Sequence, residues 1–232
     1  DTDEVTVTVN ISKPEAPSFT GTISVDEEGL ADGTNPDATS ETATWTAPDG
    51  YTIVSVSDGK LGTVVKTGDT TLDYTLSDAI THPAGSGENT ATGADSFEVT
   101  IMDGDGNTYT VKVDVDVTDD VPSISADSLS KDVASGAEVT GRVDIDYGAD
   151  NEGGQKSLTV NGQKGTAVED GKLSFDLENG TLVFDPATGG YEFTAKANVT
   201  TDQTLEFVVT DADGDTDEVT VTVNISKPEA PS

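Results

Sequence analysis

The chain has 232 residues, with 11 basic and 45 acidic side chains and a formal net charge of −34. This balance excludes a nucleic-acid-binding protein, because phosphate contacts need Lys and Arg, and it argues against docking on anionic membranes. The chain has no cysteine and one histidine, His82, so disulfides, thiolate metal sites and sites with two histidines are excluded.

Apolar and polar residues alternate along the chain, as in 5–9, 96–101 and 111–117. A period of two predicts half-buried strands, so we expect a folded protein despite the high charge. No stretch approaches the roughly 18 apolar residues of a membrane span. In chain order, strands are expected near 20–25, 41–46, 51–56, 61–65, 72–76, 96–102 and 108–117, and then near 139–146, 156–160, 173–177, 181–184, 190–195, 204–210 and 216–225.

Two repeats organise these strands. Residues 1–18 are identical to 215–232, and 97–117 align with 205–225 without a gap. About seven short strands per hundred residues predict all-β, immunoglobulin-like β-sandwiches joined end to end. We expect the last strand and linker of a preceding repeat at 1–18, sandwiches at 19–117 and 124–225, a Pro-containing linker at 118–123, and a linker to the next repeat at 226–232.

Several motifs resemble the tandem Ig-like repeats of large RTX adhesins that Gram-negative bacteria export by type I secretion. The most specific are HPAGSGEN (82–89), the DGDGNT and DADGDT turns, and DDVPS (119–123). The resemblance spans nearly the whole chain. It implies an extracellular or cell-surface extender module in cell adhesion and biofilms, stiffened by Ca²⁺ between domains. The glycine-rich nonapeptide repeats of that family and a secretion signal are missing, so we expect a piece from the middle of a longer protein.

The carboxylates themselves also point to calcium. DGDGN (103–107) and DADGD (211–215) resemble the start of an EF-hand loop, but the later Glu and the helices are missing. A hairpin calcium site and a plain Asp/Gly turn both remain open. Candidate oxygen ligands in the 103–107 hairpin and its surroundings are Asp103, Asp105, Asn107 and Asp49, which would face the linker at 13–18.

Sandwich topology brings a larger acidic group to the 118–123 junction. The loops of the second domain at this pole, the linker, and the loops of the first domain converge there. Crowded carboxylates repel one another, and oxygen-only ligands with flexible spacing suit calcium. We expect ligands among Asp119 and Asp120 of the linker, Asp146, Asp150, Asp211, Asp213 and Asp215 of the second domain, and Asp26, Glu27, Glu28, Asp78 and Glu88 of the first.

Competing interpretations are weaker. His82 could be a ligand or a base, but a single histidine is more often structural. Trp45 could stack on a sugar but is more often a core residue, and a threonine row on one strand is too small for ice binding. Carboxylates in recurring turns do not indicate a glycosidase, so we expect no enzyme. The sequence predicts a monomeric spacer rod whose partners are neighbouring repeats; the alternative is a carbohydrate- or protein-binding module.

Overall fold

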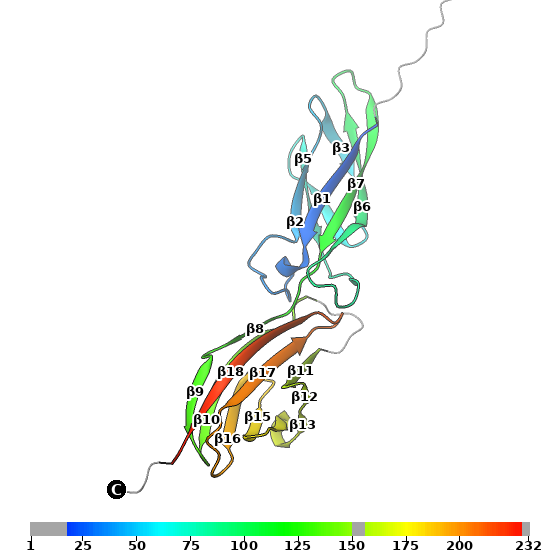
Figure 1. Cartoon of the computed structure of the whole chain (residues 1–232). Coiled ribbons are helices and arrows are strands. Elements are labelled where there is room, and N and C mark those ends of the chain that lie inside the picture. The colour runs from blue at the N-terminus through cyan, green and yellow to red at the C-terminus, as the bar shows by residue number, and fades with distance from the viewer. Residues whose placement is uncertain (1–17, 150–155, 229–232) are drawn as a thin grey trace, which may run out of the picture.

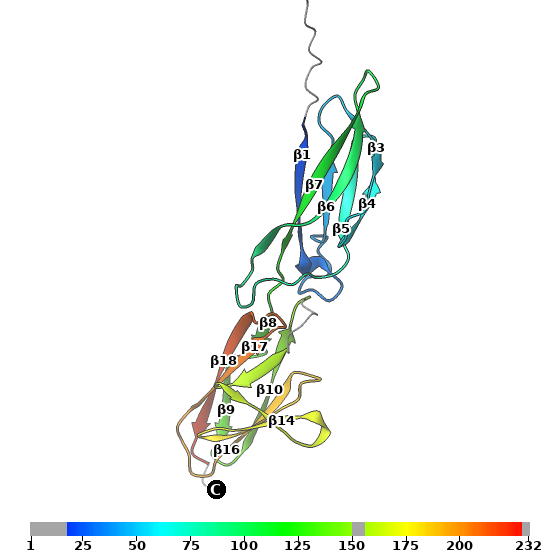
Figure 2. The same ribbon diagram turned by 90° about the vertical axis from the view of Figure 1, so that its right-hand side faces the viewer.

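The computed structural model describes residues 18–149 and 156–228. Two elongated β-sandwiches follow each other lengthwise, and the chain passes once from the first to the second (Figures 1 and 2). The expected strand at residues 1–11 lies outside the described residues. Among the described residues, no helix is long and apolar enough to cross a membrane.

The first sandwich has two sheets. One has the order β1-β7-β6-β3, in which β1 and β7 are parallel, and the other has the order β2-β5-β4. Every strand predicted for this domain is present. The bounds are β1 (Thr20–Asp26), β2 (Thr42–Thr46), β3 (Thr52–Val56), β4 (Gly62–Lys66), β5 (Thr71–Leu76), β6 (Thr90–Met102) and β7 (Thr108–Thr118), with a 3-10 turn η1 (Glu27–Gly29) after β1.

The core of this sandwich follows the alternation in sequence. In β7, Val111, Val113, Val115 and Val117 are fully buried, and Trp45 is buried in the same cluster, as predicted. The start of β6 differs from the prediction, because pairing with β7 begins six residues earlier than the alternation indicates. The register shifts between Ala91 and Asp95, so the period of two is readable only after this bulge.

The second sandwich has sheet orders β13-β14-β15-β16-β10-β8 and β12-β11-β17-β18-β9. Phenylalanines from four strands fill its core, together with valines of β17 and β18. The bounds are β8 (Ser123–Ala126), β9 (Ser130–Ala134), β10 (Glu138–Asp146), β11 (Ser157–Val160), β12 (Gln163–Lys164), β13 (Thr166–Ala167), η2 (Glu169–Gly171), β14 (Leu173–Asp176), β15 (Gly180–Phe184), β16 (Gly190–Ala195), β17 (Gln203–Thr210) and β18 (Thr216–Ser226).

Four strands of this sandwich are not among those that the sequence predicts: β8, β9, β12 and β13. Strands β8 and β9 each bury one large apolar residue, Ile124 and Val133, so they show no alternating pattern. Their presence shortens the segment between the sandwiches. Thr118 still belongs to β7 and Ser123 already to β8, which leaves residues 119–122 as the connection.

Candidate metal centre

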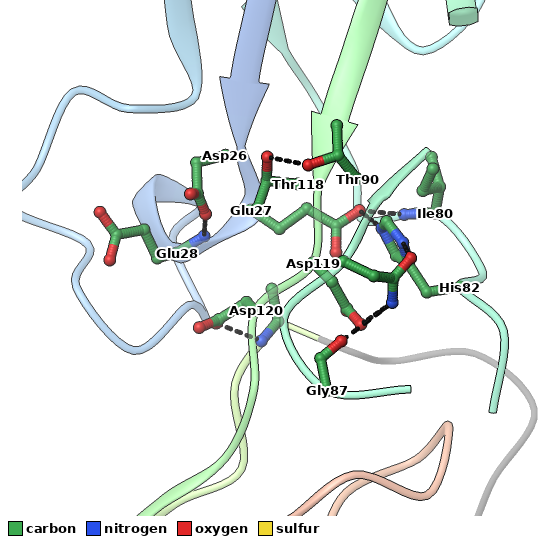
Figure 3. A network of polar contacts seen from close by, with 12 residues as sticks. Asp26, Glu27, Glu28, Ile80, His82, Gly87, Thr90, Thr118, Asp119 and Asp120 are labelled. Atoms are coloured by element: carbon green, nitrogen blue, oxygen red, sulfur yellow. Dashed lines mark hydrogen bonds and ion pairs between the residues drawn. The ribbon is translucent and has the colours of Figure 1, made fainter. Parts of the chain in front are cut away.

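Four segments meet where the sandwiches join: the connection at 119–122, the β17–β18 turn at 211–215, η1 after β1, and the loop at 77–89 between β5 and β6. Figure 3 shows the side of this junction formed by the first domain. A hydrogen bond from the Gly87 amide to Asp215 Oδ1 (2.7 Å) joins the two domains here. Segments distant in sequence thus come into contact at one junction.

The β17–β18 turn arranges its own carboxylates. Asp211 Oδ1 accepts hydrogen bonds from the amides of Gly214 (2.9 Å) and Asp215 (2.7 Å). Gly214 has φ +107°, a backbone conformation that favours glycine. One oxygen of Asp211 therefore holds the turn, and its other oxygen is left for a different partner.

Asp119, Asp213 and Asp215 each place a carboxylate oxygen within 4.8 Å of the other two. Asp119, Asp211 and Asp215 are only 2%, 2% and 4% exposed. A set of buried oxygens here has no hydrogen-bond partner: Asp119 Oδ1, Asp211 Oδ2, Asp213 Oδ2 and Asp215 Oδ2. Burying a carboxylate oxygen without a donor or cation is costly, so this group has the chemistry of a cation site made of oxygens.

The pKa values follow from this crowding. Burial and the charges of Asp213, Glu27 and Asp215 raise the pKa of Asp119 to about 7, against the opposing effect of His82. Burial and the adjacent Asp213 carboxyl raise the pKa of Asp211 to about 6. Burial also raises the pKa of Asp26, and the charges of Glu28, Glu88 and Asp120 add to this. The junction therefore favours neutralisation of its carboxylates, by protons or by a cation.

This predicts a pH dependence in the absence of divalent cations. The pKa of Asp119 rises from an ordinary 3.8 to about 7 in the fold, so between these values the folded state binds more protons than the unfolded state. In EDTA, the contribution of Asp119 should therefore lower the free energy of unfolding as pH rises from about 4 to about 7. Thermal unfolding of the wild type and Asp119→Asn across this range isolates the contribution. Parallel pH profiles of the two proteins would contradict the prediction.

The first domain supplies a second group. Glu27, His82 and Asp119 each offer a ligand atom within 4.8 Å of the other two, and all three residues are buried. Glu27 Oε1 accepts a hydrogen bond from the Ile80 amide (2.6 Å) and lies 3.5 Å from His82 Nε2. The sequence alone favours a structural role for His82, whereas the structure places it beside two carboxylates. The sequence signal that could have included it is its place in the HPAGSGEN segment (82–89), which also contains the predicted ligand Glu88.

Asp120 has a different role from its neighbour. Its Oδ2 accepts hydrogen bonds from the amides of Thr34 (2.8 Å) and Ala149 (2.9 Å), and its Oδ1 bonds the Thr34 hydroxyl. Ala149 also packs in the core cluster of the first domain. Asp120 therefore links the domains directly, through donors that the chain itself supplies.

The other predicted ligands lie outside both groups. Asp146 Oδ1 accepts from the Gly148 amide (3.1 Å), and Asp26 Oδ1 accepts from the Glu28 amide (3.0 Å). Asp150 lies outside the described residues. Within the described ranges, the two groups of three contain none of the remaining candidates at this pole: Asp26, Glu28, Asp78, Glu88, Asp120, Asp146 and Asp211, of which Asp211 has a buried oxygen without a partner.

In the matching hairpin of the first domain (103–107), the carboxylate of Asp103 finds its hydrogen-bond donors within and next to the hairpin. Asp103 accepts hydrogen bonds from the Asp105 amide, the Asn107 amide and side chain, and the Tyr109 hydroxyl (2.8–3.1 Å). The side chain of Asn107 is the main cause of the lowered pKa of Asp103. Of the described residues, no group of three candidate ligands includes Asp49, Asp103 or Asp105. These bonds fit a plain Asp/Gly turn.

No family model matches the sequence, and no curated protein matches it. Solved structures with tandem domains are similar at low identity. Domains 4 and 5 of the S-layer protein SbsC match at 19% identity and TM-score 0.29, covering 78% of this chain and 72% of that one. Titin domains Z1Z2 in complex with telethonin match at 15% identity and TM-score 0.36, covering 91% of this chain and 93% of that one. Protocadherin gammaB7 EC3-6 matches at 15% identity and TM-score 0.32, covering 93% of this chain and 47% of that one.

Proposed function

We propose that the chain is a spacer segment of an extracellular adhesin, in which a calcium ion fixes two sandwiches end to end. The observation that carries the proposal is the set of buried carboxylate oxygens without hydrogen-bond partners on Asp119, Asp211, Asp213 and Asp215. Asp119 belongs to the connection between the domains and the others belong to the second domain. A cation held by both would oppose bending at 119–122.

The ligand chemistry favours calcium over other cations. The group contains carboxylate oxygens alone, which suit Ca²⁺, Mg²⁺ or Mn²⁺ rather than copper or zinc. Calcium tolerates irregular arrangements of six to eight oxygens, whereas magnesium requires a near-ideal octahedron. Ligands that come from two separate segments, the connection and the β17–β18 turn, meet the irregular geometry of calcium more readily than an octahedron. The chain would then act as a monomeric rod whose contacts are with neighbouring repeats.

Small-angle X-ray scattering tests the rod. We expect EDTA to broaden the distance distribution and lower the mean radius of gyration, because the joint loses its cross-link. Added NaCl should restore little of this, since screening over about 8–10 Å does not replace ligation. Calcium at about 10 mM, above the 10⁻⁴–10⁻³ M dissociation constants of extracellular sites, should restore it.

A matched pair of variants identifies the site. Asp213→Asn should reproduce the effect of EDTA even with calcium present. Asp105→Asn makes the same change at the equivalent position of the first domain's hairpin, and it should scatter like the wild type. A radius of gyration that EDTA leaves unchanged would refute the calcium-fixed joint.

A further inference from the structure

His82 is the only histidine of the chain, and it is 4% exposed, at the junction. It lies in the loop between β5 and β6, beside η1 and the connection to the second domain (Figure 3). Its Nε2 has no hydrogen-bond partner, and Asp119 Oδ1, in the same group, has none either. The oxygen-only group does not account for a buried imidazole nitrogen in this position.

The surroundings of Asn89 determine which ring nitrogen carries the proton. Asn89 Nδ2 donates to Gly87 O (3.0 Å) and to Asp119 Oδ2 (3.0 Å), which fixes the amide so that Oδ1 faces the ring. That oxygen lies 3.2 Å from His82 Nδ1 and can only accept, so Nδ1 is the donor. In the neutral ring, Nε2 then carries the lone pair. This is the arrangement of a metal-binding histidine oriented by its second nitrogen.

We propose that Glu27, His82 and Asp119 form a second cation site, which takes a first-row transition metal such as Zn²⁺. Imidazole is a preferred ligand of zinc, copper, nickel and iron, and carboxylates complete mixed sites of this kind. Their ligand atoms lie within 4.8 Å of one another, and three protein ligands leave a fourth position for water. The site goes beyond the proposed calcium joint, with which it shares only Asp119.

The two sites would act on different sides of the same connection. Calcium would tie Asp119 to the turn of the second domain, while zinc would tie it to η1 and the 77–89 loop of the first domain. Asp119 would be the shared ligand: its Oδ1 has no hydrogen-bond partner, and its Oδ2, which accepts from Asn89, keeps a further lone pair. The nitrogen of His82 is what separates the sites chemically, since calcium binds oxygen ligands.

Zinc titration of the full chain, followed by ¹H–¹⁵N spectroscopy of the imidazole, tests the site. The chain has one histidine, so one set of ring signals reports the result. With calcium present throughout, one equivalent of zinc should shift Nε2 while Nδ1 stays protonated. His82→Gln should lower the zinc affinity by at least about 100-fold, because losing a group that only orients a metal ligand already costs about 10- to 100-fold. Asp105→Asn should bind zinc like the wild type.

Ring signals that do not move at several equivalents of zinc would overturn the site. So would an unchanged zinc affinity in His82→Gln, because it would place the metal on other carboxylates. The wild-type spectrum decides the question even if His82→Gln folds poorly. Asp213→Asn keeps this test apart from the calcium joint, because it should abolish the calcium-dependent increase in the radius of gyration while the zinc-induced ring shift persists.

Discussion

Asp119→Asn is expected to raise the melting temperature of the chain in EDTA and to remove most of the stabilisation that calcium provides. The wild-type carboxylate is buried among acidic groups, and its pKa of about 7 reflects that environment. One like-charge contact at 4 Å costs about 1 kcal/mol even in water, so neutralising Asp119 should recover at least that amount. Asn keeps an oxygen that can accept the hydrogen bond from Asn89.

With calcium the order of stability should reverse. A bound ion stabilises the wild type by about 1–3 kcal/mol when calcium exceeds the dissociation constant ten- to hundredfold. Each kcal/mol of stabilisation raises the melting temperature of a domain of 60–100 residues by about 4–8 °C. Thermal unfolding of both proteins, with EDTA and with calcium, gives the four values needed. A lower melting temperature of Asp119→Asn in EDTA would mean that the chain itself stabilises this carboxylate, and the cation site would be wrong.

Most of the fold could be predicted because the strands that build the cores alternate strictly. The valines of β7 alternate with Lys112, Asp114 and Asp116, which leaves one interpretation of which face is buried. The short edge strands β8 and β9 could not be predicted, since one apolar residue each gives no period. Pairing with β10 and β18, which is tertiary, is what makes them strands.

The candidate site could be predicted only as a region. Topology brings the loops to one pole, but it does not say which carboxylates the chain satisfies by itself. Asp119 and Asp120 are neighbours in an extended connection, where successive side chains point in opposite directions. One faces acidic residues and the other faces amide donors. The two related turns differ in the same way. In the first domain, Asn107 donates a hydrogen bond to Asp103. The second domain has Asp215 at the position of Asn107, and Asp215 accepts a hydrogen bond from the Gly87 amide.

Asp95→Ala should destabilise the first domain by about 3–5 kcal/mol, because it leaves several buried donors without an acceptor. Asp95 is 4% exposed, like the acidic residues at the junction, but its carboxylate accepts four hydrogen bonds. The donors are the amides of Lys60 (2.9 Å), Leu61 (2.9 Å) and Ser96 (2.8 Å), and the hydroxyl of Tyr74 (2.9 Å). Burial alone would raise the pKa of Asp95, but these bonds outweigh it and the pKa is lowered.

The loss should be the same with calcium and with EDTA, because every partner of Asp95 is part of the chain. A lowered pKa means that the stabilisation is present above the ordinary value of 3.8 and is lost as pH falls through the folded value, the opposite direction to Asp119. Urea unfolding monitored at Trp45, the only tryptophan, follows this domain alone. If calcium restored the stability of Asp95→Ala, the ion would be acting through the core of the first domain. A loss that calcium does not change leaves its action at the joint, where the buried carboxylates have no donors of their own.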